Sequence, residues 1–172
     1  VTAMKIKSVK IKNFRGYRDE ICVDFDNLTV LIGKNDIGKS TILEALDIFF
    51  NEGNGIVKWD KSDLNVQAIE NGENETIISV CFTELPENIV IDSTVQTDLS
   101  SEYMLNAAKD LEIIKKFKAS KPAVFIKALH PTNPECCDLL LKKNDDLKNI
   151  ADILDIECEN LSTNSKIRKA IW

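Results

Sequence analysis

Alternating polar and apolar residues near the N-terminus predict two neighbouring strands. In Met4–Phe14, lysines interleave with Ile6, Val9 and Ile11, and the alternation slips by one residue around Ser8. Such a slip is typical of a bulge in a twisted strand. After a turn at Gly16, the alternation resumes in Ile21–Phe25. We therefore expect these two segments to form an antiparallel layer.

The next apolar run has a different character, because Leu28–Ile32 is almost entirely apolar. A continuous run of this length predicts a strand that is buried on both faces, as in a parallel sheet. A glycine-bearing loop follows, and from Ser40 the apolar residues recur every three or four positions, which predicts a helix that ends near Asn51–Gly55. The order is therefore strand, loop, helix.

The second half of the chain predicts more strands and then helices. Ile77–Phe82 is a strand, and Leu111–Ala119 fits either a helix or a strand, with period two favouring a strand that pairs with Ala123–Ile126. Helices are expected from Glu135, and the polar cluster Ser162–Ser165 opens a last helix, which Trp172 cuts short. We therefore predict two domains, residues 4–134 and a truncated helical extension, residues 135–172.

Composition restricts the class of protein. The chain is 44% apolar and 29% charged, which predicts a folded domain rather than a disordered one. Its net charge of −6 argues against a freestanding basic module for nucleic acid. The lysines of the first strand leave two alternatives open, contact with DNA or a solvated sheet face. The five cysteines include no CxxC pair, and no apolar run suits a membrane span, so we predict a cytoplasmic protein with reduced thiols.

The strongest chemical signal lies between the predicted buried strand and its helix. Residues 33–40 read G-K-N-D-I-G-K-S, which fits the P-loop pattern G-x-x-x-x-G-K-[ST]. The glycines allow successive backbone N–H groups to face phosphate oxygens, and the helix N-terminus adds its dipole. Lys39 is expected to reach the β- and γ-phosphates of ATP, and the Ser40 hydroxyl to bind Mg²⁺.

The predicted nucleotide contacts of the P-loop are therefore nine consecutive residues. They are Gly33, Lys34, Asn35, Asp36, Ile37, Gly38, Lys39, Ser40 and Thr41. The competing interpretation is a glycine turn that connects a strand to a helix and binds nothing.

Two flanking segments carry a resemblance to a known group. Lys10–Tyr17 is similar to the I-x-N-F-R opening of ABC-type ATPases of the RecF, SMC and OLD (overcoming lysogenisation defect) classes. Gly33–Leu46 resembles their G-x-N-x-x-G-K-[ST] loop followed by h-L-x-A-L, and Lys61–Leu64 resembles a feature of OLD proteins. The resemblance covers residues 4–85. It implies an α/β P-loop NTPase fold, an ABC-ATPase head lobe with a mixed parallel and antiparallel sheet and a helical extension.

The resemblance also implies partners and further site residues. Such proteins bind ATP between two heads, which implies a second ATPase head, most simply in a homodimer, and they act on DNA in repair or in anti-phage defence. In OLD proteins a Toprim nuclease follows. Carried over, Arg15 and Gly16 lie near the phosphate or ribose, and Asp63 lies near the base. The alternatives are a surface salt bridge for Arg15 and a helix N-cap or turn residue for Asp63. Trp59 is either a core residue or a lid over the base.

The chain departs from the family pattern where hydrolysis is concerned. Ile89–Asp92 is followed by Ser93, where a Walker B strand has its catalytic glutamate, and neither Ile153–Glu157 nor Leu161–Asn164 supplies a Walker B strand or a signature motif. No catalytic residue is therefore assigned. We expect the full-length protein to be an ATPase, with an associated nuclease in the OLD case, and this chain alone to be inactive. A transport-type ABC subunit and a P-loop small-molecule kinase remain the alternatives.

Overall fold

The computed structural model of the chain forms two compact units. It describes residues 4–33, 38–52, 55–92, 95–119 and 121–172. The larger unit contains Met4–Glu84 and Asp110–Lys127, and the smaller unit contains Leu85–Lys109 and Ala128–Trp172. Within the described ranges, each helix is too short or too polar to cross a lipid bilayer.

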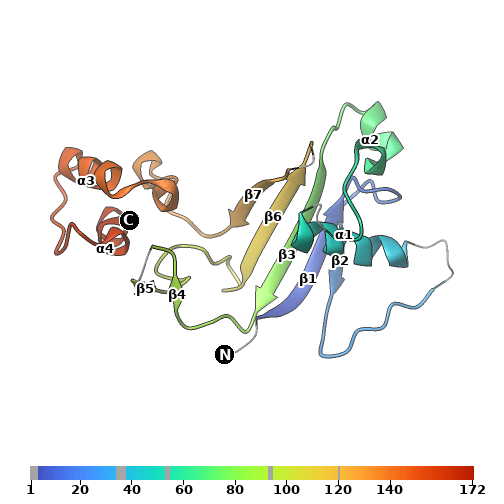
Figure 1. Cartoon of the computed structure of the whole chain (residues 1–172), viewed down its shortest axis with the longest axis horizontal. Helices are drawn as coiled ribbons and strands as arrows, with labels where there is room; N and C mark the ends of the chain where they lie inside the picture. The colour runs from blue at the N-terminus through green and yellow to red at the C-terminus, as the bar shows by residue number, and fades with distance from the viewer. Residues whose placement is uncertain (1–3, 34–37, 53–54, 93–94, 120) are drawn as a thin grey trace. The chain divides into compact units, whose positions relative to one another are not determined.

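The larger unit is built on a five-stranded antiparallel sheet (Figure 1). The order of its strands is β2-β1-β3-β6-β7, and each neighbouring pair is antiparallel. The strands are β1 (Lys5–Lys12), β2 (Ile21–Asp24), β3 (Thr76–Thr83), β6 (Leu111–Phe117) and β7 (Ala123–Lys127). The sequence predicted each of these strands, including the pairing of β6 with β7.

The predicted slip in the first strand is a real irregularity. The register between β1 and β3 shifts between Ile6 and Ser8, and beyond the shift Val9 lies opposite Val80. After the shift, Val9 and Ile11 point to one face of the sheet and are fully buried. The bulge therefore lets a strand with an interrupted alternation keep its apolar residues in the core.

One helix, α1 (Lys39–Asn51), covers the buried face of this sheet (Figure 1). Its buried residues recur at helical spacing. They are Ile42, Ala45, Ile48 and Phe49. Lys115 of β6 donates a hydrogen bond to the Phe49 carbonyl over 2.8 Å, and the rings of Phe50 and Phe82 meet edge-to-face with centroids 6.1 Å apart. Each fully buried aliphatic or aromatic side chain stabilises the fold by about 1.5–3 kcal/mol. The buried face of α1 therefore holds the helix on the sheet.

The prediction of a doubly buried parallel strand at Leu28–Ile32 was wrong. The segment is not a strand, and Leu28, Val30 and Ile32 are 83%, 66% and 89% exposed. A strand needs a neighbour to take its backbone N–H and C=O groups. None of the described strands is paired with this segment, and every strand pair in the described part of the chain is antiparallel.

Trp59 is a core residue, which decides between its two interpretations. It lies in the connection between α1 and β3, which also contains the short helices η1 (Lys61–Asp63) and α2 (Val66–Glu70). The indole stacks on Phe117, with ring centroids 5.9 Å apart, and its Nε1–H donates to the Thr76 hydroxyl over 3.0 Å. The polar end of the ring is thus satisfied inside the core.

The smaller unit combines a short hairpin with the predicted helices. The hairpin is β4 (Ile89–Val90) with β5 (Gln96–Thr97), and the helical elements are η2 (Pro134–Cys136), η3 (Leu139–Leu141), α3 (Asn144–Ile153) and α4 (Asn164–Ile171). The predicted helical extension and its last helix are confirmed. The predicted boundary at residue 134 differs from this division, because residues 85–109 group with the helices rather than with the sheet.

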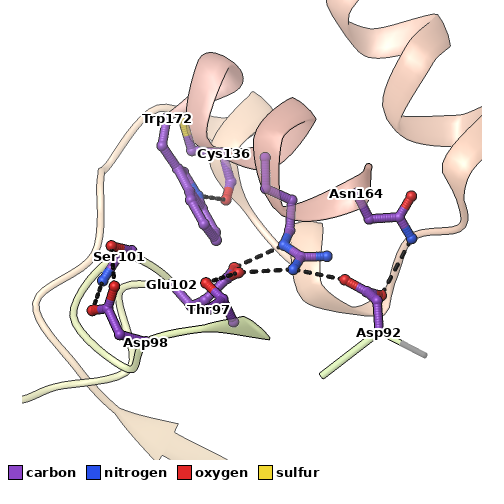
Figure 2. Close-up of polar contacts among 9 residues, drawn as sticks. Asp92, Thr97, Asp98, Ser101, Glu102, Cys136, Asn164 and Trp172 are labelled. Atoms are coloured by element: carbon purple, nitrogen blue, oxygen red, sulfur yellow. Dashed lines mark hydrogen bonds and ion pairs between the residues drawn. The ribbon is translucent and has the colours of Figure 1, made fainter. Parts of the chain in front are cut away.

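A buried ion pair explains why residues 85–109 belong to the smaller unit (Figure 2). Arg168 of α4 is fully buried, and its Nε and Nη2 donate to the two carboxylate oxygens of Glu102 over 2.8 and 2.9 Å. Asp92 accepts a second contact from Nη2 at 2.9 Å. Burial alone would lower the pKa of Arg168, but the hydrogen bonds to Glu102 and Asp92 outweigh it, so the pKa is raised and the guanidinium stays charged.

This network predicts a large effect of removing one of its charges. Glu102→Gln leaves a buried guanidinium without its main partner, so we expect the free energy of unfolding of the smaller unit to fall by about 3 kcal/mol. Urea unfolding is followed by the ¹⁹F resonance of fluorotryptophan at Trp172, which lies in this unit. The exposed Glu159→Gln is the control and should change stability by less than about 0.5 kcal/mol. Equal midpoints for the two variants would contradict this prediction.

Candidate nucleotide-binding site

The P-loop lies at the start of α1. Residues 34–37 lie outside the described residues, so the predictions for Lys34, Asn35, Asp36 and Ile37 are not examined by the structure. Gly33 and Gly38–Ser40 are described, and Gly38 precedes the first helical residue, Lys39. Gly38 has φ 79° and ψ 10°, in the left-handed region, which glycine adopts without the strain that a β-carbon adds.

The first turn of α1 has the features of an anion site. The first N–H groups of an α-helix have no intrahelical acceptor, and the helix dipole favours negative charge there. The first turn of α1 contains no acidic residue. The Lys39 ammonium donates to the Gly33 carbonyl, so the side chain folds back toward the start of the loop. Ser40 is exposed on the same turn, so its hydroxyl is accessible to a ligand or ion, and Thr41 follows, half-buried.

The structure places Arg15 and Asp63 in direct contact. Arg15 lies in the turn after β1, and its Nε donates to Asp63 Oδ1 over 2.9 Å, while its backbone N–H donates to the Asp63 carbonyl over 2.6 Å. The Arg15 guanidinium also pairs with Glu44, on α1. The salt-bridge alternative for Arg15 is therefore realised, and contact with a phosphate or ribose stays a prediction.

Asp63 takes part in capping η1, but as the third residue of the capping box; the N-cap itself is Asp60. Its Oδ2 accepts from the Asp60 backbone N–H over 2.9 Å, and Asp60 accepts from Ser62 N–H over 2.9 Å, which forms a capping box around η1. The hydrogen bonds from Ser62 lower the pKa of the Asp60 carboxyl. Asp63 is 8% exposed, so its carboxylate is largely occupied by protein donors. Its contact with a base stays a prediction.

Gly16 is exposed, and a β-carbon placed on it would meet no atom within 4 Å. Its neighbour Tyr17 contacts the P-loop glycine Gly38, a contact that the sequence did not predict. The Tyr17 hydroxyl lies 3.4 Å from the Gly38 carbonyl oxygen, to which it donates a hydrogen bond. No spacing rule links a turn residue to a glycine 21 positions later, so only the folded chain brings these two residues together.

The strings that resemble a Walker B strand or a signature motif have structural roles in the smaller unit. The Asp92 carboxylate binds Arg168 and accepts from the Asn164 amide over 3.2 Å (Figure 2). Asp155 lies just after α3 with a φ of 52°, and Leu161–Asn164 leads into α4. Among the described residues, no group of three or more His, Cys, Asp or Glu side chains is arranged to hold a metal ion.

The lysines of β1 are paired with carboxylates. The nitrogen–oxygen distances are 3.5 Å for Lys5–Glu84, 2.5 Å for Lys7–Asp110, 2.9 Å for Lys10–Glu112 and 3.1 Å for Lys12–Glu73. The hydrogen bonds to Asp110 and Glu112 raise the pKa values of Lys7 and Lys10. This arrangement favours a mixed-charge sheet face over the alternative in which the strand contacts DNA.

Comparison with known proteins identifies the family. The chain matches the family model described as "AAA ATPase domain" over residues 4–171. The chain belongs to the AAA ATPase domain family. This membership, with the sheet and helix described above, confirms the predicted α/β class of P-loop NTPase heads.

Relatives of this AAA ATPase domain include several proteins named DNA replication and repair protein RecF. The one from Clostridium botulinum (strain Langeland) is 27% identical, over 92% of this chain and 50% of that protein. The one from Lactococcus lactis (strain IL1403) is 29% identical, over 69% of this chain and 37% of that protein. The one from Leptospira interrogans is 26% identical, over 84% and 44%. The chain thus spans half or less of the length of these relatives.

Alanine substitutions at three glycines of this AAA ATPase domain test the conformation of Gly38 and its contact with Tyr17, because the three sites differ in backbone strain and in free space. In Gly38→Ala, the new β-carbon would lie 2.5 Å from the Tyr17 hydroxyl oxygen, and the backbone would keep a strained φ of 79°. Gly72→Ala has a similar φ of 80° in open space, and Gly16→Ala has neither problem. We expect losses in the free energy of unfolding of more than about 2 kcal/mol, about 1 kcal/mol and less than about 0.5 kcal/mol, respectively.

Urea unfolding of the larger unit, followed by the ¹⁹F resonance of fluorotryptophan at Trp59, measures all three variants. If Gly38→Ala were no more destabilising than Gly72→Ala, the close approach of Tyr17 to Gly38 would be incorrect.

Proposed function

We propose that this chain is the ATP-binding part of a RecF-like ATPase that acts in DNA repair, and that it binds Mg²⁺–ATP at the start of α1. The observation that carries the proposal is the arrangement at residues 38–40. A left-handed glycine turns the chain into a helix whose first residues are the lysine and serine of the P-loop. Membership of the AAA ATPase domain family supports the same assignment.

The residues of the site fit both nucleotide and metal. The N–H groups in the first turn of α1 and the Lys39 ammonium supply positive potential for the β- and γ-phosphates. The exposed Ser40 hydroxyl is an oxygen ligand of the kind that Mg²⁺ prefers, and the metal, when bound, neutralises charge on the phosphate oxygens. Lys34, Asn35, Asp36, Ile37 and Thr41 complete the proposed phosphate loop, with Arg15, Gly16 and Asp63 at its edge.

Hydrolysis and assembly form the second part of the proposal. Phosphoryl transfer to water needs a residue that orients the water and groups that stabilise the transition state. Among the described residues, Asp92 is the carboxylate whose sequence context most resembles a Walker B strand, and it is bound by Arg168. We therefore propose that a second ATPase head, in a homodimer, completes the site and that DNA is the partner of the full-length protein. The RecF names of the relatives support a role in DNA repair.

A second candidate function is that of an OLD-type protein in anti-phage defence, with an associated nuclease. The resemblance of Lys61–Leu64 to an OLD feature favours it, and this segment forms η1, whose Asp63 contacts Arg15. We place it second because the relatives described above are RecF proteins. Purified full-length protein that cleaves DNA in an ATP-dependent manner would reverse this order.

Lys39 should matter far more for nucleotide affinity than Lys34. Lys39→Ala removes a charge at the start of α1, and charge-assisted contacts to phosphate contribute about 1.5–3 kcal/mol, so affinity should fall roughly ten- to a hundredfold. Lys34→Ala is the matched control, because it removes the same charge from the variable part of the loop. Calorimetric titration with a non-hydrolysable Mg²⁺–ATP analogue measures both variants, and equal losses would refute the assignment of Lys39.

The 172-residue chain by itself should turn over ATP negligibly. We expect a rate well below about 1 per second at saturating Mg²⁺–ATP, because the proposed water-orienting carboxylate and opposing head are not supplied. A phosphate-release assay checks this, with Asp92→Asn as the companion variant. Turnover at about 1 per second or faster that Asp92→Asn abolishes would show that Asp92 acts in hydrolysis.

A further inference from the structure

The turn after β1 holds α1 at two points. Arg15 pairs with Glu44, in the second turn of the helix, and Tyr17 reaches Gly38, immediately before its first residue. Arg15 and Tyr17 are two positions apart in the turn, whereas Gly38 and Glu44 are six positions apart along α1. One short turn therefore contacts both the start of the phosphate-binding helix and the turn that follows.

The turn is itself fixed in place. Phe14 and Tyr17 exchange two backbone hydrogen bonds of 2.9 Å, and the Phe14 side chain is fully buried. The Asn65 side-chain amide donates to the Arg15 carbonyl over 2.7 Å, and Arg15 N–H donates to the Asp63 carbonyl. These hydrogen bonds fix the backbone of the turn and thereby the position of Tyr17. The position of Tyr17 in turn limits where Gly38 can lie.

The contact between Tyr17 and Gly38 is close. An ideal β-carbon on Gly38 would lie 2.5 Å from the Tyr17 hydroxyl oxygen, 2.9 Å from Cζ and 3.3 Å from Cε2, which means that the end of the ring abuts the glycine. The hydroxyl also donates to the Gly38 carbonyl over 3.4 Å. That carbonyl accepts the first hydrogen bond of α1, from Ile42 N–H, over 3.3 Å. Tyr17 thus acts on the peptide group at which the helix begins.

We propose that Tyr17 is a positioning residue of the nucleotide site, which holds Gly38 in its left-handed conformation and thereby aims the first N–H groups of α1 at the β-phosphate. The proposal rests on the proposed function of the P-loop. Tyr17 acts through the backbone and contributes to the binding of phosphate, whereas it contributes nothing to recognition of the base or ribose.

The experiment uses a ligand that has phosphates and no nucleoside. Calorimetry compares Mg²⁺–tripolyphosphate with a non-hydrolysable Mg²⁺–ATP analogue for wild type, Tyr17→Ala and Tyr17→Phe, with Tyr103→Phe, at the other tyrosine of the chain, as control. We expect Tyr17→Ala to weaken both ligands by the same factor, about tenfold or more. Tyr17→Phe keeps the ring and should rescue binding to within about threefold of wild type, and Tyr103→Phe should match wild type.

Two results would overturn the proposal. Tyr17→Ala that weakens the ATP analogue but leaves tripolyphosphate unchanged would place Tyr17 against the nucleoside instead. Tyr17→Ala that binds both ligands as wild type does would show that the contact is irrelevant to binding.

A ligand-free measurement separates this proposal from the proposed function. Without ligand, the three-bond couplings between the amide proton and the α-protons of Gly38 report its φ of 79°. These couplings should change in Tyr17→Ala and keep their wild-type values in Tyr17→Phe and Tyr103→Phe. Wild type that binds neither ligand would refute the proposed function, while the couplings would still decide whether Tyr17 sets the conformation of Gly38. Unchanged couplings in Tyr17→Ala would refute the positioning role by themselves.

Discussion

The packing of α1 on the antiparallel sheet is the contact on which the candidate site depends. The sheet buries the apolar stripe of the helix, and Lys115 binds the carbonyl of Phe49 near its C-terminal end. At the other end, Gly38 turns the chain through a conformation that suits glycine. A phosphate site made of backbone N–H groups is only as well defined as the helix that carries it, so core packing and ligand geometry are coupled in this lobe.

Charged residues act differently in the two units. In the larger unit, Arg15 is shared between Glu44 and Asp63, and thus connects the turn after β1 to α1 and η1. In the smaller unit, Arg168 is fully buried against Glu102 and Asp92. Breaking a buried pair is far more costly than breaking an exposed one. The first network therefore fixes the turn after β1 against α1 and η1, at the edge of the candidate site, and the second holds a helix and a hairpin in one unit.

Much of the fold was predictable from local pattern. Alternation located β1, β2 and β6, and helical spacing located α1, because burial on one face imposes the same period on the sequence. Short apolar runs located β3 and β7. The apolar run Leu28–Ile32 was the exception. Its composition predicted that the segment is buried, but composition does not show which residues would cover it. In the described structure no neighbouring strand covers it, and Val30 is 66% exposed. Hydrophobicity predicts which segments are stabilised by burial, and only the tertiary structure shows whether other residues cover them.

The candidate site divides in the same way. The sequence by itself determined the P-loop pattern and the candidate roles of Lys39 and Ser40, because phosphate chemistry requires those residue types at a fixed spacing along a continuous stretch of chain. Tertiary structure alone decided that Arg15 pairs with Asp63, that Trp59 belongs to the core, and that Tyr17 abuts Gly38. These contacts join residues separated by between 21 and 58 positions. Their formation depends on how the sheet, the turn and the helix pack, and no local spacing encodes that packing.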